Sequence, residues 1–297
     1  MADSSKFITK PGNPLARELL EAQQSMVTET LRNHGYFNFT QDCITFVADT
    51  TAGSSDADLT MKISAPRSSS QPQAELYSKY RIRKVTVIAD AEAINAENPA
   101  LAVGKDSVTY KDIDILYADS RYLRPSVIAD NCFIAPGDTY AQKEVERTYR
   151  AFSRLNILKF INISFVPVGS AGDEGFLDAY IMLTPGRSQT ASVELEGTNS
   201  EGDLGIAVGL SYSHRNIGKG SETFTGKVRG SYESISGNLD GLLHNRYMEY
   251  SADLGISIPE FKAPISRRIR RRVQASTEAN FSMSYQERPE YLSLIHI

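Results

Sequence analysis

Side chains that usually do chemistry are few in this chain and stand far apart. They comprise four histidines and two cysteines, namely His34, His214, His244, His296, Cys43 and Cys132. The cysteines have neither a CxxC spacing nor a histidine cluster beside them, so no disulfide framework or zinc site is indicated. No nucleophile–base pair, close pair of acids or phosphate-binding loop stands out. The sequence therefore predicts a protein without catalytic residues, metal or cofactor, with both cysteines buried as small apolar residues.

Composition excludes some classes of protein. The 297 residues carry a formal net charge of −4, with a pI near 5.7. A nucleic-acid-binding domain is usually strongly basic, so no nucleic-acid partner is expected. No run of apolar residues reaches the ~18 that a membrane helix needs. That leaves open a membrane protein built of strands, in which only every second residue is apolar.

Two stretches of the first 186 residues follow the same order. Residues 11–63 begin with Pro11-Gly12-Asn13 and predict a helix that stops at His34-Gly35, followed by two strands. Residues 136–183 begin with Pro136-Gly137-Asp138 and predict a helix and two strands again. We interpret this as a repeat of one small α+β unit.

The second copy has more chain in front of it. A strand over Tyr80–Ile88 and a short helix over Arg124–Phe133, introduced by Pro125, give it the order strand, helix, helix, strand, strand. Residues 89–120 are expected to be an insertion with a hairpin at Val108–Tyr110 and Ile113–Tyr117. We therefore expect a partial unit at 1–66, which lacks the opening strand, a linker at 67–78 with Ser68, Ser69, Ser70 and Pro72, and a complete unit at 79–186.

Beyond Arg187 the apolar residues recur with period two. Five long runs alternate in this way, centred on Val193, Val208, Val228, Leu254 and Phe281. A water-soluble sandwich also alternates, but its strands usually run ~5–6 residues, whereas a tilted strand that crosses a bilayer needs ~9–11. Charged and small residues interleave on one face, and aromatic residues such as Tyr212, Tyr232 and Tyr285 occur on the other. Residues 187–291 therefore predict an antiparallel transmembrane β-barrel, incomplete at five strands, with an atypical tail at 292–297.

The turn after the second of these strands carries the most specific motif. Arg215, Asn216, Ile217 and Gly220 resemble the Arg-Asn-hydrophobic-aromatic-x-Gly turn of the BamA/TamA outer-membrane assembly family, with Gly218 in place of the aromatic residue. Together with the repeated βααββ unit, which resembles a polypeptide-transport-associated (POTRA) domain, the chain is most similar to the TamA-type member of Bacteroidetes, TamL. We expect the turn itself to be a plain Gly-rich hairpin connection.

The resemblance implies a function and a location. It implies an insertase of the bacterial outer membrane that receives unfolded outer-membrane proteins through periplasmic POTRA domains and a barrel seam. The partners that it implies are these unfolded proteins, outer-membrane lipid and a TamB-like protein of the inner membrane. The seam would be the first barrel strand, with Thr190, Ala191, Ser192, Val193, Glu194 and Leu195. The basic run Arg267–Arg272 would lie in a periplasmic turn, either as a solvated loop or against anionic headgroups.

The same resemblance places a client-binding edge in the second α+β unit. Its middle strand would lie at the edge of the sheet, with Ile161, Ile163 and Phe165 toward the helices and Asn162 and Ser164 toward solvent. The residues of this expected edge are Lys159, Phe160, Ile161, Asn162, Ile163, Ser164 and Phe165.

Two other functions fit the same architecture. An outer-membrane transporter of the two-partner secretion type would move a substrate through its pore, and a plug helix ahead of the POTRA domains would favour it. A passive porin or adhesin is the third reading. The repeated α+β unit counts against it, because a passive pore does not need client-binding periplasmic domains.

Overall fold

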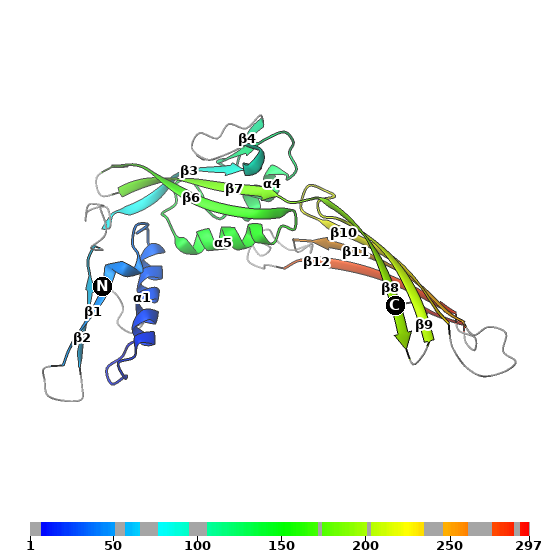
Figure 1. Ribbon diagram of the computed structural model, residues 1–297. Helices are drawn as coiled ribbons and strands as arrows, with labels where there is room; N and C mark the ends of the chain where they lie inside the picture. The colour runs from blue at the N-terminus through cyan, green and yellow to red at the C-terminus, as the bar shows by residue number, and fades with distance from the viewer. Residues whose placement is uncertain are drawn as a thin grey trace.

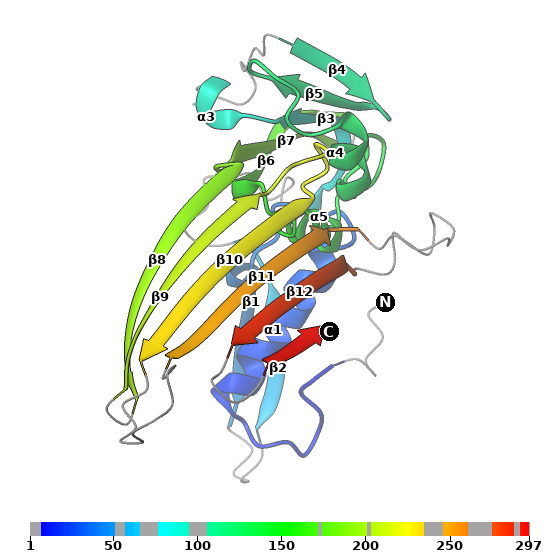
Figure 2. The ribbon, with the colours of Figure 1, turned by 90° about the vertical axis from the view of Figure 1, so that its right-hand side faces the viewer.

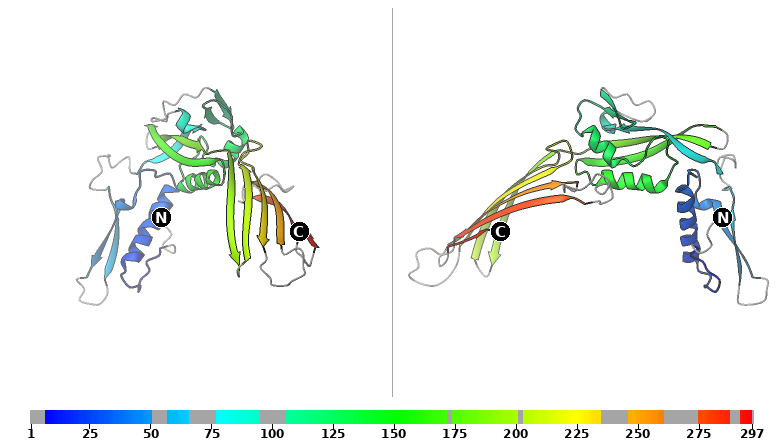
Figure 3. Two further views of the ribbon diagram at one scale, coloured as in Figure 1. Left: turned by 45° about the vertical axis from the view of Figure 1, so that its right-hand side comes forward. Right: turned by 180° about the vertical axis from the view of Figure 1, so that it is seen from behind.

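The chain is a mixed α+β protein whose strands form three separate open sheets (Figure 1). The computed structural model describes residues 7–50, 57–65, 77–94, 106–171, 174–200, 203–234, 246–260, 275–287 and 292–296. In the views of Figures 1 and 3, the two α+β parts lie at one end and a long curved sheet extends from the other. Among the described helices, none has the length and apolar character to cross a membrane.

The first α+β unit is a helix packed on a two-stranded hairpin. Helix α1 (Arg17–Arg32) is followed by the 3-10 turn η2 (Gln41–Cys43) and by the antiparallel strands β1 (Ile44–Asp49) and β2 (Asp58–Ile63). Its small core consists of the buried residues Phe39, Cys43 and Ile44, on which Val27, Leu31, Tyr36, Phe46, Met61 and Ala65 pack. The helix ends just before Gly35, whose φ of 101° suits a residue without Cβ. The predicted helix and two strands are present.

The second unit contains a five-stranded sheet. In chain order its elements are β3 (Lys79–Ile88), α3 (Ala91–Ile94), β4 (Asp106–Tyr110), β5 (Ile113–Tyr117), α4 (Pro125–Asn131), α5 (Gln142–Ser153), β6 (Leu158–Ala171) and β7 (Glu174–Pro185). The strand order is β4-β5-β3-β7-β6. One face of the sheet carries the main core, which includes the fully buried Val85, Ile115, Phe152, Leu177 and Leu183.

The expected hairpin inside residues 89–120 is present and extends the sheet. Strand β5 pairs in parallel with β3 from Val85 to Ile88, and β4 pairs antiparallel with β5. A strand at a sheet edge exposes a row of unpaired backbone groups, and a neighbouring strand covers them. The inserted hairpin therefore covers the outer edge of β3 and leaves β6 and the short β4 as the two edges of this sheet.

The third sheet is a meander of long strands. Its members are β8 (Gln189–Ser200), β9 (Asp203–His214), β10 (Thr223–Ser234), β11 (Arg246–Ile258), β12 (Thr277–Glu287) and β13 (Leu292–His296), each antiparallel to the next. The five predicted strands are present, although Val273 and the basic run Arg267–Arg272 lie outside the described residues. One expectation was wrong: the tail is a sixth strand, because its backbone pairs with the last five residues of β12, from Met283 to Glu287.

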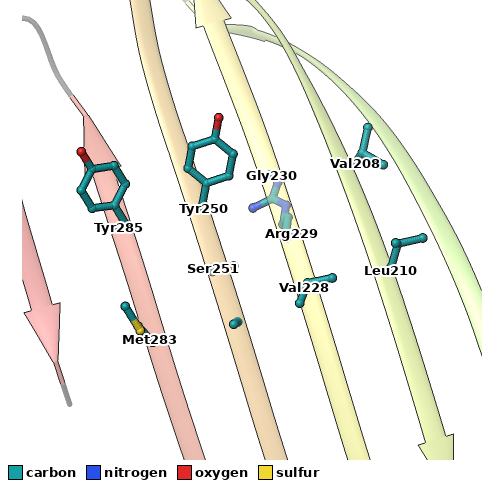
Figure 4. A pocket seen from close by; sticks show the side chains of 10 residues that line it. Val208, Leu210, Val228, Arg229, Gly230, Tyr250, Ser251, Met283 and Tyr285 are labelled. Carbon is teal, nitrogen blue, oxygen red and sulfur yellow. The ribbon is translucent and has the colours of Figure 1, made fainter.

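Figure 2 shows β8 to β12 side by side in this sheet. Their cross-strand registers divide the sheet into rows of alternating apolar and polar residues. The central apolar row contains no aromatic residue and consists of Val193, Leu210, Val228, Ala252 and Met283. The rows on either side contain aromatic residues, namely Tyr212 and Phe281 in one and Tyr250 and Tyr285 in the other. Figure 4 shows Val208, Leu210, Val228, Tyr250, Met283 and Tyr285 gathered on this face.

Two glycines of β10 make room for large neighbours on the apolar face. A Cβ on Gly230 would lie 3.5 Å from Cδ1 of Tyr250, and one on Gly226 would lie 3.6 Å from Cδ2 of Leu254. Aromatic and aliphatic side chains that cover a neighbouring glycine help to fix the register of a curved sheet. The glycines therefore belong to the packing of the apolar face.

Polar side chains occupy the opposite face. The rows between the apolar ones contain Ser192, Ser211, Lys227, Asp253 and Ser282, and then Glu194, Gly209, Arg229, Ser251 and Ser284. The expected division is confirmed, because Lys227, Arg229, Glu249 and Glu278 share one face and Val208, Val228, Leu254 and Phe281 share the other. No described element packs over the apolar face, where Val193 is 67% and Leu195 81% exposed.

This exposed apolar face predicts the behaviour of the purified chain. Monomeric soluble proteins rarely expose a contiguous apolar patch larger than a few hundred Å². The chain in aqueous buffer should therefore aggregate, and a mild detergent should make it monodisperse, as measured by size-exclusion chromatography with light scattering. A monodisperse monomer without detergent would contradict the assignment of this face to a membrane.

Candidate functional site

The histidines and acidic residues of the described ranges are spread over the fold. No group of three or more His, Cys, Asp and Glu residues within the described ranges is arranged to hold a metal. His34 and His214 bond the neighbouring backbone, through Nδ1 to the Thr30 carbonyl at 2.6 Å and to the Asn216 N–H at 3.2 Å. His244 lies outside the described residues, and the side chain of His296 is not described. The candidate site consists of the backbone of the sheet edges and of the joints that position them.

The expected seam residues all lie in β8, the first strand of the long sheet. Within the described chain β8 pairs with β9 alone, from Gln189 to Ser200, so its other side has no neighbouring strand. Side chains from Ala191 to Gly197 are exposed on both faces. A long straight edge of this kind can accept another strand by main-chain hydrogen bonds.

The expected client-binding residues lie in β6, at one edge of the second sheet. Among the described strands, β6 pairs with β7 alone, with irregular register at Leu158–Phe160 and Pro167–Ser170. Ile161, Ile163 and Phe165 pack against the core, as expected, and Asn162 is exposed. Ser164 differs from the expectation: it is only partly exposed, and its Oγ is buried without a hydrogen-bond partner. Because Ser164 lies opposite Tyr180, which is itself buried, the solvent-facing side of the strand is less polar than the sequence indicated.

An aromatic cluster joins the two α+β units beside β6. Phe37 of the first unit contacts the rings of Tyr80, Tyr140 and Phe165 in edge-to-face geometry, with centroids 5.1 to 5.8 Å apart. Arg32 donates from Nη2 to the Tyr140 hydroxyl at 2.9 Å. Edge-to-face pairs add about 0.5–1.5 kcal/mol each beyond the area they bury. The cluster therefore fixes the first unit against the β6 edge strand.

The contact between the two α+β units also supplies the N-terminal cap of helix α5. Helix α5 has Ala141 at its N-cap, with no capping side chain of its own. The Lys143 N–H instead donates to Oδ1 of Asn33, from the first unit, at 2.7 Å. An unsatisfied N–H at the start of a helix needs such an acceptor. The carbonyl of Gly35 also accepts from the Tyr80 N–H at 2.9 Å, and a Cβ at Gly35 would lie 2.8 Å from Cγ2 of Thr139.

The turn from Arg215 to Glu222, between β9 and β10, forms a second joint, between the long sheet and the second α+β unit. The buried Asn216 donates from Nδ2 to the Tyr122 carbonyl at 2.7 Å and accepts the Ser221 N–H on Oδ1 at 2.9 Å. The fully buried Ser221 accepts the Ile157 N–H on its Oγ at 3.1 Å. The turn connects the adjacent antiparallel strands β9 and β10, as expected, and its side chains also bind both ends of the second unit's helical region.

The Glu222 carboxylate and two neighbouring glycines also stabilise this joint. Glu222 accepts the N–H groups of Gly218 and Gly220 at 3.2 and 2.9 Å, and pairs with Arg124 at 3.0 Å. A Cβ at Gly220 would lie 2.3 Å from Nη2 of Arg124, so a side chain at this position would displace the Arg124–Glu222 ion pair. Gly218 leaves the space that the Glu222 carboxylate occupies, since a Cβ on Gly218 would lie 3.0 Å from Oε2 of Glu222.

Tyr122 connects the joint to the centre of the second unit. Its hydroxyl donates to the carbonyl of Ala89, and burial raises the pKa of the phenol above its usual range. Tyr117 lies nearby, fully buried, and donates to the carbonyl of Leu123 at 2.8 Å, and burial raises its pKa to about 12. Both phenols therefore stay protonated donors at neutral pH. The sequence analysis did not predict that Tyr122 would contact the joint. The only local signal is its position, with Arg124, just before Pro125, where the loop ends and the helix begins.

Comparison with known proteins returns only distant structural likeness. No family model and no curated protein matches the chain. The crystal structure of BamA from Haemophilus ducreyi lacking POTRA domains 1-3 matches with a TM-score of 0.42 at 11% identity, covering 95% of this chain and 47% of that one. CdiB from Acinetobacter baumannii matches with a TM-score of 0.30 at 11% identity, covering 93% and 47%. POTRA3-5 of BamA from Haemophilus influenzae matches with a TM-score of 0.21 at 13% identity, covering 61% and 91%.

The chain spans about half the length of the first two of these structures. With TM-scores below 0.5, the three likenesses do not assign it to a family.

The second joint yields a stability prediction. Replacing Asn216 with Ala leaves the Tyr122 carbonyl and the Ser221 N–H without their partner, which should lower the free energy of unfolding by about 1–3 kcal/mol. The neighbouring Ile217, 58% exposed, is the matched control, and Ile217→Ala should change the free energy of unfolding by less than about 0.5 kcal/mol. Denaturant unfolding in detergent measures both, and amide exchange at Ser221 localises the effect. Equal effects of the two substitutions would mean that the turn does not depend on its buried amide.

Proposed function

We propose that this chain is part of an outer-membrane assembly factor, an insertase of the BamA/TamA kind closest to TamL. In this proposal the long sheet lies in the outer membrane of a bacterial cell and the two α+β units lie in the periplasm as POTRA-like domains. The chain catalyses no covalent reaction. It receives unfolded outer-membrane proteins, and a TamB-like partner stays a prediction of the resemblance.

The membrane placement follows from the dimensions and the faces of the long sheet. Strand β10 has 12 residues and, at about 3.3 Å per residue, is about 40 Å long. Tilted by about 45°, such a strand spans about 28 Å, close to the thickness of the hydrocarbon core. The exposed apolar rows, with aromatic residues on both sides of an aliphatic centre, suit lipid, and the opposite face with its charged residues suits a wet lumen.

The single observation that carries the function is the edge of β8, which in the described chain pairs with β9 alone and lies next to the second α+β unit. Only three residues, Gly186 to Ser188, separate β7 from β8. The Gly186 N–H donates to the Ile157 carbonyl, and the Arg215 N–H donates to the Ser188 carbonyl, so this link is itself fixed. An unfolded strand that reaches the second unit therefore finds the edges of β6 and β8 joined by a short, hydrogen-bonded link.

Pairing at such edges suits a protein with many clients. Main-chain hydrogen bonds recognise an extended shape more than a particular sequence. A strand entering a membrane must satisfy its backbone groups before it leaves water, since lipid offers no partners. Edge β8 offers these partners along 12 residues.

Cysteine cross-linking tests the proposal at β8. Both native cysteines, Cys43 and Cys132, are buried, so an added cysteine is the only exposed thiol in the described chain. Membranes containing the Val193→Cys protein are mixed with a urea-unfolded outer-membrane barrel protein that carries one cysteine in its last strand. We expect disulfide cross-links with the unfolded client and none with the same client folded in advance. The mid-sheet variant Ala252→Cys, in the same apolar row, is the control, and equal yields at both positions would exclude pairing at the edge.

A proline pair tests the edge of β6. Neighbouring residues of a strand direct their N–H groups to opposite sides, so of Asn162 and Ile163 one N–H points to β7 and the other points outward. Proline at the outward position removes one donor from the free edge and leaves the pairing with β7 intact. That variant should fold, as judged by limited proteolysis, and should cross-link less to clients from a nearby Lys159→Cys probe. Normal folding with unchanged cross-linking would exclude this edge as a client-binding site.

A further inference from the structure

Side chains of the edge strand β8 form ion pairs with β10, a strand with which β8 has no backbone pairing. On the polar face Glu194 approaches Lys227 with Oε2 and Nζ 3.1 Å apart, and Glu196 approaches Arg229 with Oε2 and Nη2 2.6 Å apart. Lys227 and Arg229 belong to β10, and β9 lies between the two strands. Both ion pairs therefore cross over β9, where ordinary cross-strand pairs join neighbours only.

Small residues on β9 make this crossing possible. On its polar face β9 carries Gly205, Ala207, Gly209, Ser211 and Ser213. Gly209 lies directly between Glu194 and Arg229 in the register, and a Cβ on it would lie 3.4 Å from Oε2 and 3.5 Å from Cβ of Glu194. A longer side chain on Gly209 would occupy the space that the Glu194 side chain now fills. Ser192 and Ser211 add a hydrogen bond between their hydroxyls, at 2.6 Å, beside the crossing.

The edge position explains why such a connection matters. Within the described chain β8 has hydrogen bonds on one side only, whereas β9, β10 and β11 have neighbours on both. Local opening starts where contacts are fewest, so β8, like the short β13 at the other edge, is more prone to separate than the strands between them. Each ion pair is partly exposed, with side-chain exposures of 39% to 58%, so a single pair is weak. Two pairs side by side act on the same strand.

We infer that Glu194 and Glu196, through Lys227 and Arg229, are positioning residues that hold β8 on the sheet in register while its outer edge stays open. The inference rests on the proposed function, in which that outer edge pairs with a client strand. The ion pairs act on the inner attachment of β8 and leave its outer backbone groups free. The four residues and Gly209 thus form a strap across β9, and the strap keeps the outer edge extended and ready to pair.

Hydrogen exchange tests the strap without any client. The chain in detergent is labelled in deuterated buffer, and peptides from each strand of the long sheet are followed by mass spectrometry. We expect Glu194→Gln with Glu196→Gln to speed exchange in Gln189–Ser200 about five-fold, because losing both pairs favours local opening, and to leave β11 unchanged. Glu278→Gln is the matched control, since Glu278 lies on the same face of β12, four strands from β8, and should leave β8 as in the wild type.

Two further variants separate the strap from a general loss of charge. The full swap of Glu194 and Glu196 to Lys with Lys227 and Arg229 to Glu restores opposite charges and should restore slow exchange of β8. Gly209→Leu removes no charge but blocks the crossing, and it should speed exchange of β8 as the double Gln variant does. If the double Gln variant exchanges as the wild type does, or if the swap fails to restore protection in a folded protein, the strap is overturned.

Client cross-linking then separates the strap from the proposed function. The Val193→Cys probe is placed in the double Gln variant and in the wild type. Faster exchange of β8 together with weaker cross-linking supports the strap and its positioning role. Faster exchange with unchanged cross-linking shows that the ion pairs hold β8 but do not position it for clients, which overturns the inference and leaves the proposed function standing. Absent cross-linking in the wild type would instead refute the proposed function.

Discussion

The unpaired backbone groups at the edge of a sheet are the constraint on which the rest of this structure depends. A strand with a neighbour on one side only leaves a row of N–H and C=O groups that must find water or another strand. The described chain covers some of these rows, since β5 lies along β3 and β13 lies along part of β12. It leaves β6 and β8 open, and these are long strands of 14 and 12 residues. The proposed function uses the two long edges that the fold leaves uncovered.

Two joints give these edges fixed positions. The aromatic cluster around Phe37 and the borrowed cap from Asn33 hold the first unit against the second. The turn around Asn216 and Ser221 holds the long sheet against the second unit. Buried polar groups of this kind are costly when unpaired, so each joint favours one arrangement over others. The α+β units and the long sheet are thereby coupled by specific hydrogen bonds in addition to the connecting chain.

Periodicity of the sequence predicted the elements and the faces of the sheets well. The alternation around Val208, Val228, Leu254 and Phe281 has only one solution once the strands pair, because a shift of one residue would exchange the two faces. The edge position of β6 followed from the resemblance and is what the structure has. The tail was misjudged because five residues, Leu292–His296, are too few for alternation to stand out.

Contacts between units could not be predicted in the same way. Asn216 and Tyr122 are 94 residues apart, and Asn33 and Lys143 are 110 apart, so no local pattern links them. The buried hydroxyl of Ser164 and the pairing of Glu194 with Lys227 across β9 likewise depend on how strands lie beside one another. The sequence shows a glycine at position 209, but the need for a small residue there becomes apparent only when the register places it under the Glu194 side chain.

The central claim is that one face of the long sheet contacts lipid and the other contacts water, and β10 offers the most direct measurement. The chain contains no tryptophan, so single tryptophans at positions 227 to 232 can be read one at a time in liposomes with brominated acyl chains. The account predicts strong quenching at Val228, Gly230 and Tyr232 and weak quenching at Lys227, Arg229 and Ser231. Quenching that does not alternate along the strand, or that is stronger on the charged face, would contradict it.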